Sequence, residues 1–195
     1  MNDQVQGGNP LFPIFLKLDQ IQTLIVGGGN VGLEKLEALL KNDPNARVTI
    51  VAPEIRLEIK TLANENLNLV ERAFKKKDLK KVDLVILATD QPELHKKIKK
   101  RADKRHLLVN VADTPELCDF YLGSTVKKGD LKIGISTNGK SPTFAKRFRE
   151  VLEEILPDET DELLSNLKSI RDKLKGDFQE KVKELNKITS VLKDK

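Results

Sequence analysis

The sequence has one cysteine, no tryptophan and one tyrosine, and aromatic residues make up 4% of its 195 residues. The single cysteine, Cys118, excludes an intramolecular disulfide. No segment approaches the roughly 20 apolar residues that cross a bilayer, and the first thirty residues lack a basic segment followed by an apolar run. We therefore expect a cytoplasmic protein without a membrane span. The shortage of aromatic rings also leaves few platforms for nucleic-acid bases.

Positive charge is concentrated in one part of the sequence. The formal net charge is +5, and residues 75–105 contain twelve Lys and Arg against five Asp and Glu. Such a band attracts anions, either a phosphate backbone or a small polycarboxylate. Alternatively, the basic residues between 96 and 101 form the solvated side of a surface helix. Because aromatic residues are so few, we expect no nucleic-acid partner.

Short apolar strands alternate with helical patterns between residues 22 and 112. The segments that predict strands are residues 22–26, 47–51, 67–71, 83–88 and 107–112. Helical spacing of apolar residues separates several of them, at residues 31–40, 55–63 and 92–102. This alternation predicts an α/β fold with a parallel, doubly wound sheet of the Rossmann type and right-handed crossovers.

The pattern changes after the last of these strands. Residues 131–136 predict a strand that follows a Gly129-Asp130 turn, with residues 120–126 as its partner. Ser141-Pro142 begins a helix, because Ser is a favoured N-cap and Pro is tolerated in the first turn. The apolar stripe of this helix consists of Phe144, Phe148, Val151 and Ile155. Two further amphipathic patterns predict a C-terminal helical region.

A glycine motif lies directly after the first predicted strand. Gly27-x-Gly29-x-x-Gly32 places a tight turn at the first glycine, close approach of the backbone to a pyrophosphate at the second, and close helix packing at the third. The phosphates would rest on the N-terminus of the following helix. Because the motif connects a strand to a helix within a β-α-β unit, it predicts a dinucleotide site rather than a merely tight structural turn.

A Rossmann site usually has an acidic residue about 20 residues further on, at the tip of the second strand, where it holds the ribose hydroxyls. This tip ends in Pro53-Glu54. Either the Glu54 carboxylate or the backbone of Pro53-Glu54 takes that role. A carboxylate here would repel a 2′-phosphate, so the sequence favours NAD over NADP.

Polar residues also follow two later strands, where ligands of such sheets bind. Thr89-Asp90 follows one strand, and Asn110 and Asp113 lie at the end of the next. Asp113 is either a turn residue before Pro115 or a carboxylate that takes a proton near the nicotinamide. Asp90 has the same two interpretations, and the Gln91-Pro92 that follows favours the cap.

The segment Ser136 to Pro142 is a polar turn that leads into a helix N-terminus. Its hydroxyls, free N–H groups and Lys140 would attract a carboxylate. A capped helix without a ligand is the alternative.

The remaining metal-ligand and thiol candidates are isolated. His95 and His106 have no Cys or second His at ligand spacing, so the sequence predicts surface roles and no metal site. Cys118 is most simply a packed, small hydrophobic residue.

Together, these motifs resemble the precorrin-2 dehydrogenase family, the NAD-dependent module of sirohaem synthases, which in some members is also a sirohydrochlorin ferrochelatase. The similarity runs from about residue 9 to 156. The segments that carry it are Gly27 to Val31 with Lys35, Val48 to Glu54, Ala88 to Asp90, Asn110 to Asp113, Cys118 to Phe120, and Ile135 to Pro142.

The resemblance implies an NAD-binding Rossmann domain at residues 1–113, a small α+β dimerisation region at 114–142 and a helical region at 143–195. It implies a homodimer that oxidises precorrin-2 to sirohydrochlorin with NAD, and Fe²⁺ as a further substrate in the bifunctional members. It also implies that Asp113 is the catalytic base and that Thr137 lines the tetrapyrrole pocket.

The residues that we expect to bind the cofactor are Gly27, Gly28, Gly29, Asn30, Val31, Pro53, Glu54, Thr89, Asp90 and Asn110. Those that we expect to bind the tetrapyrrole are Ser136, Thr137, Asn138, Lys140 and Ser141. A non-catalytic NAD-sensing module is the alternative function, and it would need the glycine turn but neither Asp113 nor the second group of residues.

Overall fold

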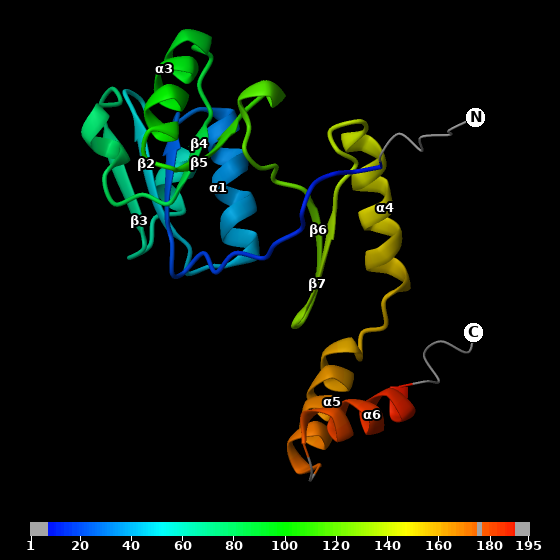
Figure 1. The fold of residues 1–195 in the computed structure, drawn as a ribbon. Helices are drawn as coiled ribbons and strands as arrows, with labels where there is room; N and C mark the ends of the chain where they lie inside the picture. Colours follow the sequence, from blue (N-terminus) through cyan, green and yellow to red (C-terminus); the bar gives the residue numbers. More distant parts are fainter. Residues whose placement is uncertain (1–7, 175–176, 190–195) are drawn as a thin grey trace, which may run out of the picture. The chain divides into compact units, whose positions relative to one another are not determined.

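The computed structural model describes residues 8–174 and 177–189 (Figure 1). These residues form two compact units that divide between Leu122 and Gly123. The division lies later in the chain than the end of the expected Rossmann domain at residue 113, and residues on both sides of position 142 belong to the second unit.

The first unit contains a five-stranded parallel sheet with the strand order β3-β2-β1-β4-β5. Its strands are β1 (Gln22–Val26), β2 (Arg47–Ala52), β3 (Leu67–Glu71), β4 (Leu84–Leu87) and β5 (Leu108–Val111). All four strand pairs are parallel. The Rossmann-type sheet predicted from the alternating pattern is therefore confirmed, with each strand within two residues of its predicted ends.

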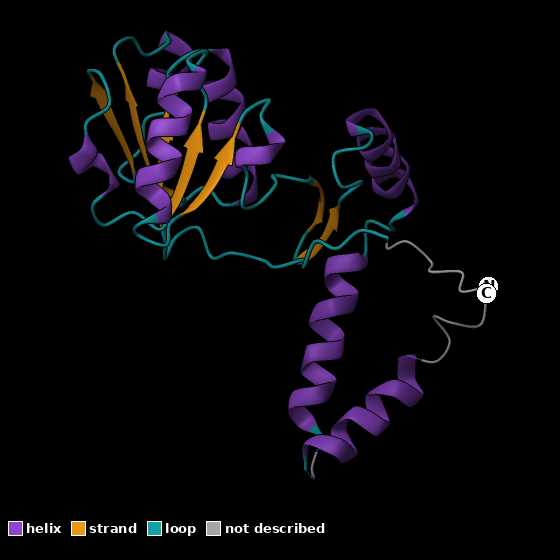
Figure 2. Cartoon of the chain, turned by 45° about the horizontal axis from the view of Figure 1, so that its top comes forward, coloured by secondary structure: helices purple, strands orange, loops and turns teal. Residues whose placement is uncertain are grey.

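Helices lie on both faces of this sheet (Figure 2). The α-helices are α1 (Asn30–Asn42), α2 (Leu57–Thr61) and α3 (Pro92–Asp103), and the 3₁₀ helices are η1 (Lys76–Leu79) and η2 (Pro115–Leu117). Neighbouring strand residues point to opposite faces; Ile25 packs in one core cluster with Leu36 of α1, and Leu24 in the other with Ile98 of α3. Two-sided burial explains why the strands are continuous apolar runs.

The second unit begins with a hairpin of β6 (Ser124–Lys128) and β7 (Leu131–Ile135). The expected partner strand of β7 is present, but it was expected at residues 120–126 and begins four residues later, at Ser124. The physical reason for the later start is that Phe120 belongs to the first unit, where its carbonyl accepts a hydrogen bond from Asn110 at 2.9 Å. The hairpin register pairs Lys128 with Leu131, so the strand runs up to the Gly129-Asp130 turn.

Three helices follow the hairpin: α4 (Pro142–Ile155), α5 (Thr160–Lys173) and α6 (Phe178–Thr189). The Ser141 hydroxyl caps α4 by accepting a hydrogen bond from the Phe144 N–H at 3.1 Å, as the sequence predicted. No helix among the described residues is long and apolar enough to cross a membrane.

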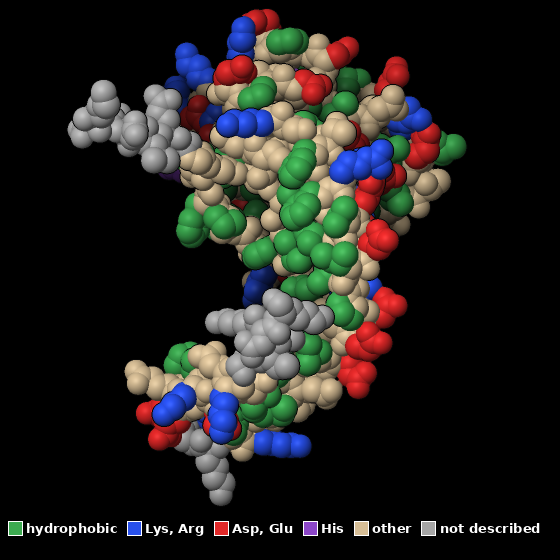
Figure 3. Space-filling model, turned by 90° about the vertical axis from the view of Figure 1, so that its right-hand side faces the viewer, with side chains coloured by type: hydrophobic (Ala, Val, Ile, Leu, Met, Phe, Trp, Pro, Cys, Tyr) green, Lys and Arg blue, Asp and Glu red, His purple; other side chains and the backbone are tan. Residues whose placement is uncertain are grey.

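The apolar stripe of α4 lies on the surface of this unit rather than in a core. Phe144 is 59% exposed and Ile155 is 64% exposed, whereas Ala145 on another face of the helix is buried. The rings of Phe144 and Phe148 stack with their centroids 5.9 Å apart. Figure 3 shows hydrophobic side chains, in green, exposed on the surface that faces the viewer.

A half-buried ion pair holds η1 after β3. The Asp78 carboxylate accepts two hydrogen bonds from the Arg72 guanidinium, at 2.7 and 2.8 Å, and a third from the Lys75 N–H at 2.7 Å. Only 7% of the Asp78 side chain is exposed. Hydrogen bonding to Arg72, opposed by desolvation, holds the pKa of Asp78 below its ordinary value.

We expect Asp78→Asn to lower the free energy of unfolding at pH 7 by about 1–3 kcal/mol, because hydrogen bonds to a charged group are lost. A carboxylate with a lowered folded-state pKa contributes stability above its unfolded pKa and loses it as the pH falls toward the folded value. The difference between the two proteins in urea unfolding should therefore shrink below about pH 4. A difference that stays constant down to pH 3 would contradict this role.

Candidate functional site

The carboxyl ends of four strands bring most of the expected site residues to one edge of the sheet. The carboxyl-terminal parts of these strands lie in register: Val26 pairs with Val51 and with Leu87, and Leu87 pairs with Val111. The segments that follow carry the glycine turn, Pro53-Glu54, Thr89-Asp90 and Asp113. Residues that are distant in the sequence therefore meet at the edge where ligands of such sheets bind.

The glycine turn is pressed against the ends of two neighbouring strands. Gly27 has φ +126°, and a Cβ on it would lie 2.2 Å from the Ala88 carbonyl oxygen. A Cβ on Gly28 would lie 2.4 Å from the Glu54 carbonyl oxygen. No side chain fits at either position, so the backbone itself forms the floor of the site.

Gly29 differs from these two glycines, because no atom lies within 4 Å of the position of its Cβ. It is the N-cap residue of α1, it offers no side-chain cap, and the first turn of α1 has no acidic residue. The N–H groups of this turn therefore lie beside open space. An open approach to uncapped N–H groups at a helix N-terminus fits the pyrophosphate of a dinucleotide.

Arg56 lies beside this turn and was missed by the sequence analysis. Its backbone N–H donates to the Gly28 carbonyl at 3.0 Å, and its guanidinium donates to the side chains of Asn30 and Glu58. The hydrogen bond from Arg56 holds the pKa of Glu58 below its ordinary value. The signal available in the sequence was a cation two residues after Glu54, and this cation opposes the repulsion that Glu54 would exert on a 2′-phosphate.

Three other expected cofactor residues lie close to the turn. Pro53 and Glu54 are exposed directly after β2, and Val31 is half-buried against the core on the α1 side of the sheet. Pro53-Glu54 is therefore accessible to a ligand, whereas Val31 contributes mainly to the packing of α1.

Thr89 and His95 connect the end of β4 to α3. The Thr89 hydroxyl lies 2.8 Å from His95 Nε2 and accepts a hydrogen bond from the Gln91 N–H at 3.3 Å. His95 is 3% exposed, so its expected surface role is wrong: its helical position turns it inward toward Thr89. Burial lowers the pKa of His95, and the Asp90 charge opposes this shift. Asp90 itself is exposed and is not the N-cap of α3.

Asn110 and Cys118 are engaged in holding a segment along the outer edge of β5. The Asn110 amide donates to the Phe120 carbonyl at 2.9 Å and is 7% exposed. The Cys118 sulfur accepts from the Val111 N–H and donates to the Val111 carbonyl, both at 3.2 Å. Burial raises the pKa of the Cys118 thiol. The side chain of Asn110 therefore has a structural partner already.

Asp113 differs from these residues, because its side chain is exposed and has no hydrogen bond or ion pair within the described part of the chain. Its backbone has φ +57°, a left-handed conformation that is uncommon outside glycine. Thr114 N–H instead closes the turn on the Val111 carbonyl at 3.4 Å. A side chain that caps nothing and a strained backbone are typical of a functional position.

The expected tetrapyrrole residues belong to the second unit. Thr137 Oγ1 accepts from the Ser141 N–H at 3.2 Å, and Ser136 Oγ accepts from the Asn138 N–H at 3.2 Å. Asn138 has φ +53°, and Lys140 is exposed. These hydrogen bonds fix the loop at the N-terminus of α4 and leave the Lys140 ammonium accessible.

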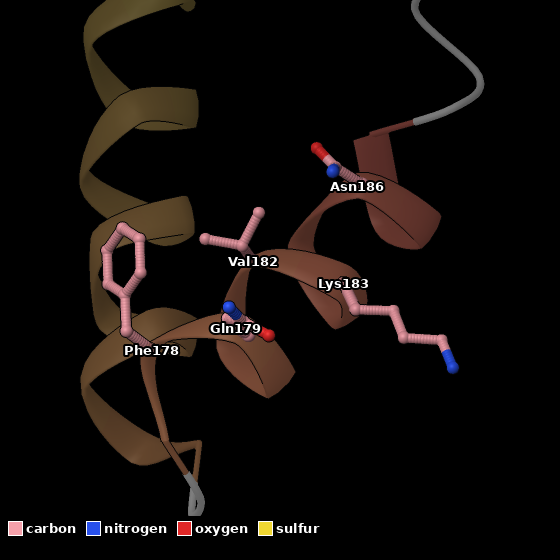
Figure 4. Close-up of a pocket in the computed structure, with 5 residues that line it drawn as sticks. All are labelled: Phe178, Gln179, Val182, Lys183 and Asn186. Atoms are coloured by element: carbon pink, nitrogen blue, oxygen red, sulfur yellow. The ribbon is translucent and has the colours of Figure 1, made fainter.

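Two further features of the described residues bear on binding: the arrangement of potential metal ligands and a cavity in the second unit. Within the described residues, no group of three or more His, Cys, Asp and Glu is arranged to hold a metal ion. A shallow cavity of about 300 Å³ is lined by residues of α6 alone: Phe178, Gln179, Val182, Lys183 and Asn186. Figure 4 shows Val182 and Lys183 pointing in different directions from that helix. None of these residues is an expected site residue.

Comparisons with known proteins match both units. A family model described as "Putative NAD(P)-binding" matches residues 14–124, and the "Sirohaem biosynthesis protein central" model matches residues 128–155. Siroheme synthase of Pseudoalteromonas translucida is 38% identical over 86% of this chain and 35% of its own length. Siroheme synthase of Psychrobacter cryohalolentis is 36% identical over 88% of this chain and 31% of its own length. The chain thus spans about a third of these relatives.

A solved structure, "SirC, precorrin-2 dehydrogenase", is similar over 91% of this chain and 89% of that chain, with a TM-score of 0.71 and 25% identity. Because the first family model covers more than half of the sequence, the chain belongs to this NAD(P)-binding family, and its resemblance to precorrin-2 dehydrogenases and sirohaem synthases is confirmed.

Proposed function

We propose that this chain is an NAD-dependent precorrin-2 dehydrogenase, which oxidises precorrin-2 to sirohydrochlorin in sirohaem biosynthesis. Its similarity to SirC over nearly the whole of both chains supports this activity. The single structural observation that carries the proposal is the unpartnered Asp113 carboxylate at the strand edge that holds the glycine turn. A non-catalytic NAD sensor would need the turn but would have no use for an unpartnered carboxylate there.

The cofactor would be held by the backbone at the glycine turn. The N–H groups of the first turn of α1 would receive the pyrophosphate beside Gly29, and Pro53-Glu54 would meet the adenosine ribose. When bound, NAD⁺ supplies a hydride acceptor. Gly27 and Gly28 hold the turn against the ends of β4 and β2, which would fix the distance between a bound nucleotide and the carboxyl ends of the strands.

Asp113 would act as the general base. Oxidation of precorrin-2 to sirohydrochlorin removes a hydride and a proton, so the reaction needs a proton acceptor as well as the cofactor. An exposed carboxylate without a partner of its own is free to take that proton. Its place two residues beyond the end of β5 fixes it to the same edge as the glycine turn. Lys140 and the hydroxyls of Ser136 and Thr137 would hold substrate carboxylates.

Replacing Gly29 separates cofactor binding from folding. Gly29→Leu should leave the unfolding free energy within about 1 kcal/mol, because its Cβ meets open space and its φ of −87° suits any residue. The side chain would occupy the approach to the N–H groups, so NAD⁺ affinity should fall at least about tenfold. Fluorescence titration with NAD⁺ measures this.

Gly28→Leu is the matched control, since its side chain would collide with the Glu54 backbone and should destabilise the fold itself. Unchanged NAD⁺ binding in a folded Gly29→Leu protein would contradict the predicted pyrophosphate position. The same titration with NADP⁺ shows whether repulsion of the 2′-phosphate by Glu54 exceeds its attraction by Arg56. Equal affinities for NAD⁺ and NADP⁺ would mean that Arg56 offsets the repulsion by Glu54.

Asp113→Asn tests the chemistry, because asparagine also tolerates a positive φ but cannot accept the proton. We expect an unchanged fold and NAD⁺ affinity, and a dehydrogenation rate lower by about 10²–10⁴-fold, measured as anaerobic formation of sirohydrochlorin by absorbance. Asp113→Gly should be equally inactive yet more stable by about 1 kcal/mol, since glycine relieves the left-handed strain. Near-normal turnover of the folded Asn variant would remove Asp113 from the mechanism and leave Asp90 as the next candidate.

Supplying sirohydrochlorin and Fe²⁺ directly tests metal insertion by itself, the second activity of some members of the family. If the carboxylate also takes the protons that leave during insertion, both activities of Asp113→Asn should fall together. Loss of one activity alone would mean that the two steps use separate bases.

The apolar stripe of α4 supports a homodimer as the working form. Phe148 is 43% exposed and Val151 is 49% exposed, and they continue the stripe formed by Phe144 and Ile155. A contiguous apolar face of this kind is costly to leave in water and is typical of an interface. A second copy of the same helix is self-complementary, because it brings the same stripe.

Phe148→Gln should weaken the dimer at least about tenfold in sedimentation equilibrium, since it removes an aromatic ring from the centre of the stripe. Lys146→Gln introduces the same residue on the opposite side of α4 and should leave the dimer unchanged. A monomeric wild-type protein at micromolar concentration would contradict the dimer.

A further inference from the structure

A second cleft in the first unit is lined entirely by cations. Its volume is about 490 Å³, and its lining residues are Lys76, Lys97, Lys100, Arg101, Lys104 and Arg105. One comes from η1, and the others come from α3 and the residues directly after it. No carboxylate and no aromatic ring lines the cleft.

Two lysines of α3 lie outside the cleft, and both form ion pairs. Lys96 pairs with Glu93 at 2.9 Å, and Lys99 pairs with Asp103 at 2.6 Å and with Asp119 at 2.7 Å. Within the described part of the chain, none of the six cations of the cleft pairs with a carboxylate. The acidic residues of α3 are thus already engaged, and the charge of the cleft is uncompensated.

Repulsion among these cations lowers the stability of the protein when no anion is bound. Lys97, Lys100, Arg101 and Lys104 are spaced three or four residues apart, and like charges at this spacing destabilise a helix. The helix dipole favours cations in the last turn of α3, but it does not account for Lys97 near the middle or for Lys76 on another element. A bound anion would relieve the repulsion among all six.

The cleft lies away from the glycine turn. Helix α3 begins after the carboxyl end of β4 and runs back to the start of β5, so its last turn lies toward the opposite edge of the sheet. Four of the six cations lie in the C-terminal half of α3 or directly after the helix. The cleft is therefore separate from the edge of the sheet that carries the glycine turn.

The lining residues indicate the chemistry of the ligand. Lysine and arginine without hydrophobic or aromatic neighbours offer hydrogen bonds and charge but no surface for a base or a macrocycle. Arg105 is held in place by a hydrogen bond from Nη1 to the Leu79 carbonyl at 3.0 Å, which leaves its other N–H groups for a ligand. A cleft of this volume fits a small molecule.

We propose that this cleft binds a small, multiply phosphorylated anion through its phosphate groups. Free polyphosphate and the triphosphate group of a nucleotide share this chemistry. The site is independent of the proposed dehydrogenase activity, because it uses none of the residues assigned to that reaction.

Isothermal titration calorimetry of the full chain with tripolyphosphate, at fixed ionic strength, tests the proposal. Lys100→Gln/Arg101→Gln should weaken binding about tenfold or more, because two charge-assisted contacts are lost. Lys41→Gln/Arg47→Gln removes one lysine and one arginine from exposed positions elsewhere in the same unit and should change binding less than about twofold. Equal losses in both variants would overturn the proposal, since only the net charge would then matter.

Competition identifies the site and the ligand. Saturating NAD⁺ should not displace tripolyphosphate, and Gly29→Leu should bind it normally; displacement by NAD⁺ would place the anion at the glycine turn and overturn the proposal. Similar affinities for tripolyphosphate and ATP support recognition of phosphates alone, whereas citrate binding as tightly would overturn it. A single-stranded oligonucleotide that binds more tightly per phosphate and is lost in Lys100→Gln/Arg101→Gln would instead make the cleft a nucleic-acid surface.

Discussion

Close backbone contact at the glycine turn is the constraint on which the site depends. The turn has room for no side chain where Gly27 meets the Ala88 carbonyl and Gly28 meets the Glu54 carbonyl. A Cβ on Gly32 would likewise lie 2.2 Å from the Gly27 carbonyl oxygen. The backbones at the ends of β1, β2 and β4 and at the start of α1 therefore approach one another closely at this turn. The shape of the glycine turn is therefore set by backbone geometry, which side-chain motion does not alter.

The end of β5 that leads to Asp113 is held in a different way. The sheet supplies hydrogen bonds to β5 on one side only, and the segment after η2 supplies them on the other. Asp119 accepts from the Val109 N–H at 2.9 Å while its own N–H donates to the Val109 carbonyl at 2.7 Å. The Cys118 thiol likewise accepts from the Val111 N–H and donates to the Val111 carbonyl, both at 3.2 Å. Lys99 ties Asp119 to α3. The strand that ends at Asp113 is thereby held on both sides.

The parts of the structure that follow from local sequence patterns could be predicted from the sequence. The parallel strands are continuous apolar runs, and the Gly27 to Gly32 spacing has one common geometric use, so both were predicted with their bounds nearly correct. Long-range partners could not be predicted. The inward turn of His95 depends on Thr89 Oγ1, the start of β6 depends on the hold of Asn110 on Phe120, and the position of Arg56 depends on Asn30. None of these contacts leaves a periodic signal.

The covered edge of β5 also limits how copies of this protein can assemble. An exposed edge strand is a template for another chain, because its outward N–H and C=O groups are unpaired. Here the outward groups of Val109 and Val111 are already bonded to Asp119 and Cys118. The five-stranded sheet therefore cannot be extended by strand addition at this end. Any association on that side must use side chains, so no continuous intermolecular sheet can form next to Asp113.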